Sequence, residues 1–106
     1  MDIDEFSAQL AAIASPQRLR IVAALHGTRV HVSELARRVH MSRPLLYMHL
    51  SKLQDAGFVT SELELDPEGR ALKFFELVPF SMTIDPATIA ALDSSDTESP
   101  LNRKSN

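Results

Sequence analysis

Four histidines and no cysteine define the side-chain chemistry open to this chain of 106 residues. Without thiols it has no disulfide, no thiolate metal ligand and no cysteine nucleophile. The histidines are His26, His31, His40 and His49, and their spacings match no compact zinc motif. We therefore expect histidines that are solvated or hydrogen-bonded rather than metal-binding, and we expect no cofactor.

Signals of an enzyme are also missing from the sequence. The three glycines stand where helices or strands end or turn, so they form no phosphate-binding loop. No pair of histidines has the spacing of a metalloprotease motif, and the hydroxyl side chains lie mainly at helix starts and near the C-terminus. The sequence predicts a protein without catalytic residues.

Basic residues gather in the middle of the chain, although its net charge is −3. Residues 15–56 hold seven Lys or Arg against two acidic residues, a net charge of +5, together with all four histidines. The flanking segments 1–14 and 57–106 carry −3 and −5. A basic block of this kind predicts one face that binds an anionic partner, because the net charge of the whole chain conceals a positive potential around this block. The alternative is a set of solvated helix faces.

Two further features indicate a cytoplasmic protein. No apolar stretch approaches the roughly 18 residues that a membrane span needs, and the N-terminus is acidic where a secretory signal would be basic. A single domain of this size buries a modest share of its surface, so a partner subunit would add stability.

Apolar spacing and capping residues predict five helices. Ser15, Ser33 and Ser42 are typical N-caps, and Gly27 and Gly57 are typical stops. The predicted helices cover residues 3–13, 16–26, 34–40, 42–56 and 86–92. On the second helix we expect one apolar face, formed by Leu19, Val22, Ala23 and Leu25.

The apolar period changes from helical to alternating after Gly57. Residues 59–65 and 71–78 read as two strands, and the Asp66-Pro67-Glu68-Gly69 segment between them has turn composition, so a β-hairpin is predicted. From Asp93 onward the chain is polar and predicted to be a disordered tail. We therefore expect one domain over residues 1–92 and a tail over residues 93–106.

This order of elements is typical of a winged helix-turn-helix, a mainly α fold with a β-hairpin wing. On the 42–56 helix, Leu46, Leu50 and Leu53 point inward, so Tyr47 and Met48 project outward. Apolar and aromatic side chains beside basic ones suit the major groove of DNA. The alternative is that Tyr47 and Met48 pack against the wing or a partner chain.

Residues 13–77, about 60% of the chain, resemble the ArsR-type family of dimeric winged-helix transcriptional regulators. The matching stretches are ASPQRLRI at 14–21, VSELA at 32–36, MSRP at 41–44, HLSKL at 49–53 and AGFV at 56–59. They stand in the family's order and spacing, and together they are specific.

The resemblance implies a symmetric homodimer that binds double-stranded DNA at an inverted repeat, most often as a repressor under the control of an effector. The family's DNA-contacting positions correspond to Ser42, Arg43, Leu45, Tyr47, Met48, His49 and Lys52, with Arg70 and Lys73 in the wing. The dimerisation positions on the first and last helices correspond to Ile3, Phe6, Leu10, Ile13, Ile89 and Leu92.

The chain also departs from the family pattern. His31 and Ser33 stand where the family's two metal-binding cysteines would be, which excludes a soft-metal sensor of that type. A site that joins Asp85 to a histidine across the dimer stays open as an alternative. The first strand of the wing is acidic, which favours as a rival function a winged helix that binds another protein instead of DNA. A pocket for a small-molecule effector is an alternative to a dimer core for four residues, Phe6, Phe80, Met82 and Ile84.

Overall fold

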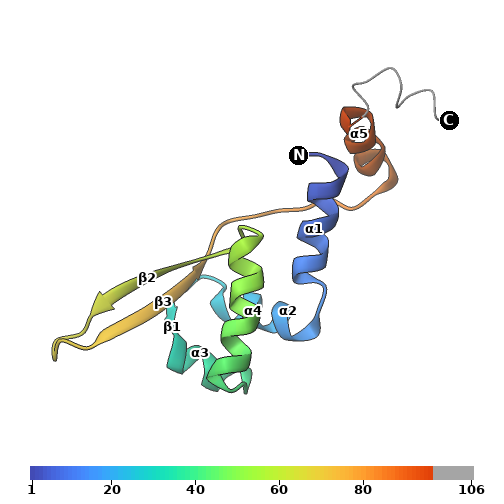
Figure 1. Ribbon diagram of the computed structural model, residues 1–106. Helices are drawn as coiled ribbons and strands as arrows, with labels where there is room; N and C mark the ends of the chain where they lie inside the picture. Colours follow the sequence, from blue (N-terminus) through green and yellow to red (C-terminus); the bar gives the residue numbers. More distant parts are fainter. Residues whose placement is uncertain (97–106) are drawn as a thin grey trace. The chain divides into compact units, whose positions relative to one another are not determined.

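A computed structural model describes residues 1–96 of the protein (Figure 1). The helices are α1 (Ile3–Ile13), α2 (Pro16–Leu25), α3 (Val32–Val39), α4 (Arg43–Asp55) and α5 (Pro86–Asp96). The strands are β1 (Val30–His31), β2 (Val59–Leu65) and β3 (Ala71–Leu77). The chain divides into two compact units, one formed by Ala12–Phe80 and the other by Met1–Ala11 with the chain from Ser81 onward.

The unit Ala12–Phe80 packs α2, α3 and α4 against one antiparallel sheet. The strand order is β1-β3-β2, and β2 and β3 pair without a bulge from Val59 opposite Leu77 to Leu65 opposite Ala71. The core consists of apolar side chains from every one of these helices and from the sheet. Its largest fully buried members are Phe58, Phe75, Ile21, Leu25, Leu35, Leu46, Leu50 and Leu53.

The predicted starts of α2 and α4 are confirmed, because their serine caps form the expected hydrogen bonds. The Ser15 hydroxyl accepts from the Arg18 backbone N–H at 3.0 Å, and the Ser42 hydroxyl accepts from the Leu45 N–H at 3.3 Å. At the other end of α4, Gly57 adopts a φ of +84°, a conformation that favours glycine. The chain can therefore turn back at once, and the Phe58 N–H donates to the Leu53 carbonyl at 2.9 Å.

The start of α3 differs from the prediction. The helix begins at Val32, two residues early, and its N-cap is His31, whose side chain makes no capping bond. Val30 and His31 pair with β3 as a third strand that the sequence did not predict. The strand leads directly into the helix, Val32 is buried, and the Ser33 hydroxyl accepts a hydrogen bond from Arg43 instead of capping the helix.

The predicted apolar face of α2 is correct for Leu25 and wrong for Leu19 and Ala23, which are exposed. Ile21 and Leu25 are buried, whereas Leu19 is 53% exposed. Leu19 and its neighbours one turn away instead line an open groove of about 530 Å³ with the chain that follows β3. The residues of this groove are Leu19, Val22, Ala23 and His26 with Leu77, Val78, Pro79 and Phe80.

The hairpin β2–β3 forms the predicted wing, and a basic side chain fastens it to the loop before β1. The Arg29 guanidinium lies 4.3 Å from the centre of the Phe74 ring on β3 and donates to Glu62 and Glu64 on β2, at 3.2 and 2.6 Å. The hydrogen bond from Arg29 to Glu64 is the main reason why the pKa of Arg29 is raised above its usual value. The acidic strand is thus partly neutralised from within the protein.

The second unit contains the first turns of α1 and all of α5. At the start of α1, Asp2 and Glu5 form a reciprocal capping box, each carboxylate accepting from the other residue's backbone N–H at 2.8 Å. The Asp85 carboxylate caps α5 by accepting from the Thr88 N–H at 2.7 Å. The helix continues to Asp96, beyond the predicted end at Leu92, and the rest of the predicted tail lies outside the described residues.

Candidate nucleic-acid interface

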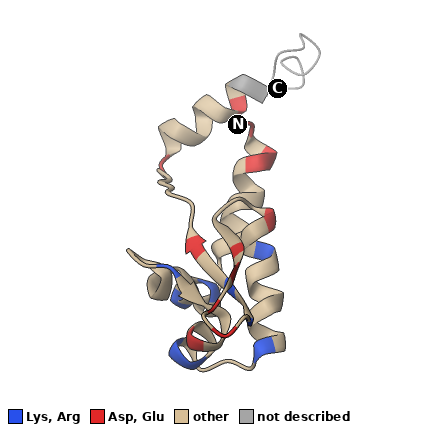
Figure 2. Cartoon of the chain, turned by 90° about the vertical axis from the view of Figure 1, so that its left-hand side faces the viewer, with Lys and Arg blue, Asp and Glu red and all other residues tan. Residues whose placement is uncertain are grey.

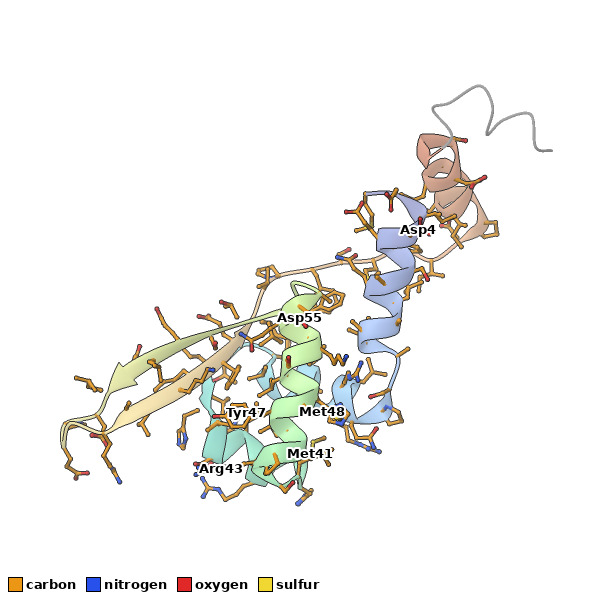
Figure 3. All side chains as sticks on the ribbon, in the orientation of Figure 1. Asp4, Met41, Arg43, Tyr47, Met48 and Asp55 are labelled. Atoms are coloured by element: carbon orange, nitrogen blue, oxygen red, sulfur yellow. The ribbon has the colours of Figure 1, made fainter. Side chains whose placement is uncertain are left out.

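Helix α4 separates a buried stripe from an exposed one. Leu46, Leu50 and Leu53 are fully buried, as predicted. We call the exposed stripe the reading face; it comprises Arg43, Leu45, Tyr47, Met48, Ser51 and Lys52, which are all exposed. Leu45, Tyr47 and Met48 are 41%, 39% and 47% exposed, so large apolar groups meet solvent beside two cations. In Figure 3, Tyr47 and Met48 lie on opposite flanks of α4.

The turn between α3 and α4 is short and well defined. His40 adopts a left-handed conformation with a φ of 55°, and the Met41 N–H donates back to the Ala36 carbonyl at 3.0 Å. Arg43 follows as the first residue of α4, and its guanidinium donates to the Ser33 hydroxyl at the start of α3. The bond ties the basic end of the reading face to α3, while Arg43 itself stays exposed.

Tyr47 connects the reading face to the wing. Its ring meets the buried Phe75 of β3 edge to face, with ring centres 6.3 Å apart. The Lys73 ammonium lies 5.8 Å from the centre of the Tyr47 ring and 5.7 Å from that of Phe75. The structure therefore brings Lys73 next to Tyr47 and shows that this tyrosine packs against the wing, although 39% of the residue remains exposed. Its contact with DNA stays a prediction.

His49 differs from the other candidates on α4. It is 7% exposed, on the side of α4 that carries Leu46, Leu50 and Leu53. Its Nδ1 accepts a hydrogen bond from Arg18 Nε of α2 at 3.1 Å. In this conformation His49 offers no surface to DNA, and positions 46, 49, 50 and 53 repeat at the spacing of one buried helix face. That spacing was the available signal for its burial.

The end of the wing is held by its own acidic residues. Arg70 Nε lies 2.6 Å from Asp66 Oδ2, and Arg70 Nη2 lies 2.9 Å from Glu68 Oε1. The Asp66 carboxylate also accepts from the Arg70 backbone N–H, which is the largest cause of the lowered pKa of Asp66. Arg70 is thus placed at the tip of the hairpin, apart from the reading face, and its charge is already compensated.

Two exposed arginines that were not among the predicted contacts lie at the end of α3, just before the turn that leads into α4. Arg37 and Arg38, in the last turn of α3, are both exposed and share Glu34 as a partner, with Arg38 Nε 2.9 Å from Glu34 Oε2. The acid compensates one of the two charges, so the end of α3 keeps a net charge of +1. Lys and Arg occur on α2, α3 and α4 (Figure 2), and the position of this pair one turn before the α3–α4 turn was the signal that could have identified it.

The predicted dimerisation residues have mixed exposure. Phe6 is 7% exposed and Ile89 37%, and Ile3, Leu10, Ile13 and Leu92 are half-buried. Their role stays a prediction. Within residues 1–96, no three His, Asp or Glu side chains are grouped as metal ligands. No helix in this part of the chain has the length and apolar character to cross a membrane.

The short helix α3, the tight turn, the exposed face of α4 and the hairpin define a winged helix-turn-helix. Residues 15–61 match the family model described as "Bacterial regulatory protein, arsR family". An uncharacterized HTH-type transcriptional regulator of Methanocaldococcus jannaschii is 36% identical over 81 residues, which cover 76% of this chain and 84% of that protein. The chain belongs to the ArsR family of transcriptional regulators.

Other relatives match less completely. The HTH-type transcriptional repressor SmtB of Mycobacterium tuberculosis is 38% identical over 60 residues, 57% of this chain and 44% of that protein. HlyU of Vibrio cholerae has the same fold, with a TM-score of 0.62, 24% identity and coverage of 87% and 88% of the two chains. So does a homodimeric winged helix-turn-helix domain of Mycobacterium bovis, with a TM-score of 0.63, 18% identity and coverage of 88% and 75%.

Proposed function

We propose that this protein is a homodimeric transcriptional repressor that binds an inverted-repeat operator by placing α4 in the major groove. The observation that carries the proposal is the open reading face, where Tyr47 and Met48 are 39% and 47% exposed within the segment of net charge +5. We also propose that it acts in the cytoplasm and has no enzymatic activity.

Several exposed side chains at and after the start of α4 have a DNA contact that suits their chemistry. Arg43, at the N-terminal end of the helix, can donate two hydrogen bonds to guanine. Leu45 and Met48 can contact thymine methyl groups, and the Tyr47 hydroxyl can donate to a phosphate or a base edge. Ser42 and Lys52 are assigned to phosphates, and Arg37 and Arg38 extend that contact along α3.

A second copy of the chain is part of the proposal, because an inverted repeat requires two copies of α4 about 34 Å apart. Large apolar side chains at the surface are the groups that a second copy would cover. Leu19, Phe80, Ile84 and Ile89 are 53%, 42%, 62% and 37% exposed. The homodimeric domain of Mycobacterium bovis and the repressor SmtB support the assembly and the sense of regulation.

Selection of bound sequences from a random duplex pool, with the purified full chain, tests the proposal. We expect an inverted repeat with half-sites centred about one helical turn apart, bound more weakly as salt rises because phosphate contacts release counterions. Sedimentation of the complex should give two chains per duplex. Transcription from a promoter that contains the site should fall when the protein is added; a rise would contradict repression.

A protein-binding role is the second candidate, and the wing favours it. Leu63 and Leu65 on β2 are 67% and 75% exposed, beside acidic residues that oppose phosphate contact. If the chain fails to bind random duplex DNA even at low salt, the DNA-binding proposal is wrong and this candidate takes its place.

A further inference from the structure

Two polar side chains meet where α2 packs against α4. On α2, Arg18 stands three residues before Ile21 and seven before Leu25, both buried. On α4, His49 stands among Leu46, Leu50 and Leu53. Among the side chains that the structure describes, His49 is the one buried polar or charged residue. A position that an aliphatic side chain would fill thus holds a hydrogen-bonded imidazole.

The geometry of this contact fixes the protonation state of the imidazole. Arg18 Nε donates to His49 Nδ1 at 3.1 Å. A guanidinium has donors and no acceptor, so Nδ1 must carry a lone pair and the ring proton must lie on Nε2. The contact therefore requires a neutral histidine.

The same guanidinium also holds the end of α1. Arg18 Nη1 donates to the Ala12 carbonyl at 3.2 Å, and the Arg18 backbone N–H donates to the cap residue Ser15. One side chain thus joins the last turn of α1, the first turn of α2 and the middle of α4, all within the unit Ala12–Phe80. His49 directly follows Met48 of the reading face, so any rotation of α4 about its axis moves both residues together.

We propose that Arg18 and His49 are positioning residues for DNA binding, and that protonation of His49 releases α4 from its binding orientation. The inference rests on the proposed function, because it concerns how the reading face is held.

If Nδ1 of His49 gained a proton, its N–H group would face the Nε–H group of Arg18, and the positive imidazolium would repel the positive guanidinium. Burial is the main cause that lowers the pKa of His49, and the charge of Arg18 lowers it further. The other elements packed on α4 are α3, β2 and, through the contact of Tyr47 with Phe75, β3. Their acidic residues act on other arginines: Glu34 pairs with Arg37 and Arg38, Glu62 and Glu64 pair with Arg29, and the charge of Glu76 on β3 also acts on Arg29. No carboxylate of these elements therefore offsets the effect of Arg18, and the release occurs below the ordinary histidine range.

The test compares His49→Asn, His49→Leu and the control His40→Asn with the natural chain. In His49→Asn the side-chain amide oxygen would replace Nδ1 as an acceptor without titrating, whereas leucine removes the acceptor. His40 is exposed and has the left-handed conformation that asparagine adopts readily, so its substitution is matched in chemistry but lies outside the contact. Fluorescence anisotropy reports affinity for the selected inverted-repeat duplex at fixed salt from pH 8 to pH 5.

We expect the affinity of the natural chain and of His40→Asn to fall with pH below the pKa of His49, about tenfold per pH unit for each copy of His49 and so up to about a hundredfold for the dimer. His49→Asn should bind as the natural chain does at pH 8 and lose this acid-side fall. His49→Leu should bind roughly tenfold more weakly at pH 8. If His49→Leu does not fold, as judged by circular dichroism, Arg18→Met replaces it with the same expectation.

Superimposable pH profiles for the natural chain and His49→Asn would overturn the inference. Unchanged binding at pH 8 by His49→Leu, or by Arg18→Met where it replaces that variant, would overturn it as well. If the natural chain binds no duplex at pH 8, the proposed function fails, and the contact between Arg18 and His49 is then tested by itself. Nitrogen chemical shifts of the free protein do this, because a change in the His49 Nδ1 shift between the natural chain and Arg18→Met at pH 8 shows that the contact exists whether or not DNA binds.

Discussion

Arg43 and Arg70 are both exposed arginines among the predicted DNA contacts, yet the structure predicts opposite outcomes when each is changed to alanine. Arg43 begins α4 and donates to the neutral Ser33 hydroxyl; among the described residues no carboxylate pairs with it. Arg70, whose side chain is 71% exposed, pairs with both Asp66 and Glu68. One full charge is available to DNA, and the other is compensated within the hairpin turn.

The magnitudes follow from this difference. Loss of an arginine that reads a base costs roughly 1–3 kcal/mol, or about 5- to 150-fold in affinity, and relaxes specificity at that position. Exposed ion pairs are worth about 0–1 kcal/mol. A phosphate would have to compete with Asp66 and Glu68 for Arg70, so we expect Arg70→Ala to change affinity by less than about threefold.

Anisotropy titrations of the selected duplex and a random duplex, at several salt concentrations, show whether Arg43 contacts a base or only a phosphate. Arg43→Ala should weaken binding to the selected duplex more than to the random one. If Arg43 contacts only a phosphate, both losses should be equal and the salt slope should fall by about 1.8, which is about 0.9 for each copy of the chain in the dimer. Thermal melting of the free variants provides the folding control. A larger loss for Arg70→Ala than for Arg43→Ala would refute the argument from ion pairing.

Three further predictions concern stability and assembly. The pKa of His49 is lower in the folded than in the unfolded protein, where it is about 6.5. The free energy of unfolding should therefore be highest above about pH 6.5 and should fall as the pH drops from there through the folded-state pKa. Urea titrations at pH 7.5 and 5.5 measure this fall, and His49→Asn should flatten it. Leu50→Ala, at a fully buried position, should lower the free energy of unfolding by about 2–5 kcal/mol, seen as a lower urea midpoint with an unchanged slope. Leu19→Ser combined with Ile84→Ser should weaken the homodimer by at least roughly tenfold in sedimentation equilibrium while leaving the circular dichroism spectrum unchanged, because these side chains are 53% and 62% exposed in the single chain. An unaltered dimer would exclude these residues from the interface.

Local signals were sufficient where the responsible interaction lies within a few residues. The caps Ser15 and Ser42 bond to backbone groups three residues away, and the hairpin strands 59–65 and 71–77 end within one residue of their predicted bounds. The expected alternation of buried and exposed side chains does not extend along β2, where Leu63 and Leu65 are exposed. The buried stripe of α4 follows its helical period. Such features are readable from sequence because chain connectivity alone brings the partners together.

The misassigned features depend on residues far away in the chain. Val30 and His31 form a strand because β3 lies beside them, more than forty residues later. Ser33 is not a cap because the helix already begins at Val32, directly after β1, so the Ser33 hydroxyl accepts from Arg43 instead. On α2, two apolar stripes are present, one with Ile21 and Leu25 and one with Leu19, and packing against α3 and α4 decides which is buried. Sequence period alone does not rank two such stripes.

The wing's acidic charge has a structural explanation that also limits its role in binding. Arg29 pairs with Glu62 and Glu64 and offsets one of their two charges, and Arg70 pairs with acidic residues at the tip, so these two arginines of the wing region are already engaged. Lys73 is the exception, and it lies over the Tyr47 ring. A wing with these pairings supports α4 through the contact of Phe75 with Tyr47 and offers few free cations for contacts with phosphates. Specific binding by this protein should therefore depend on α4 and the arginines of α3, with the hairpin acting mainly by keeping Tyr47 in place.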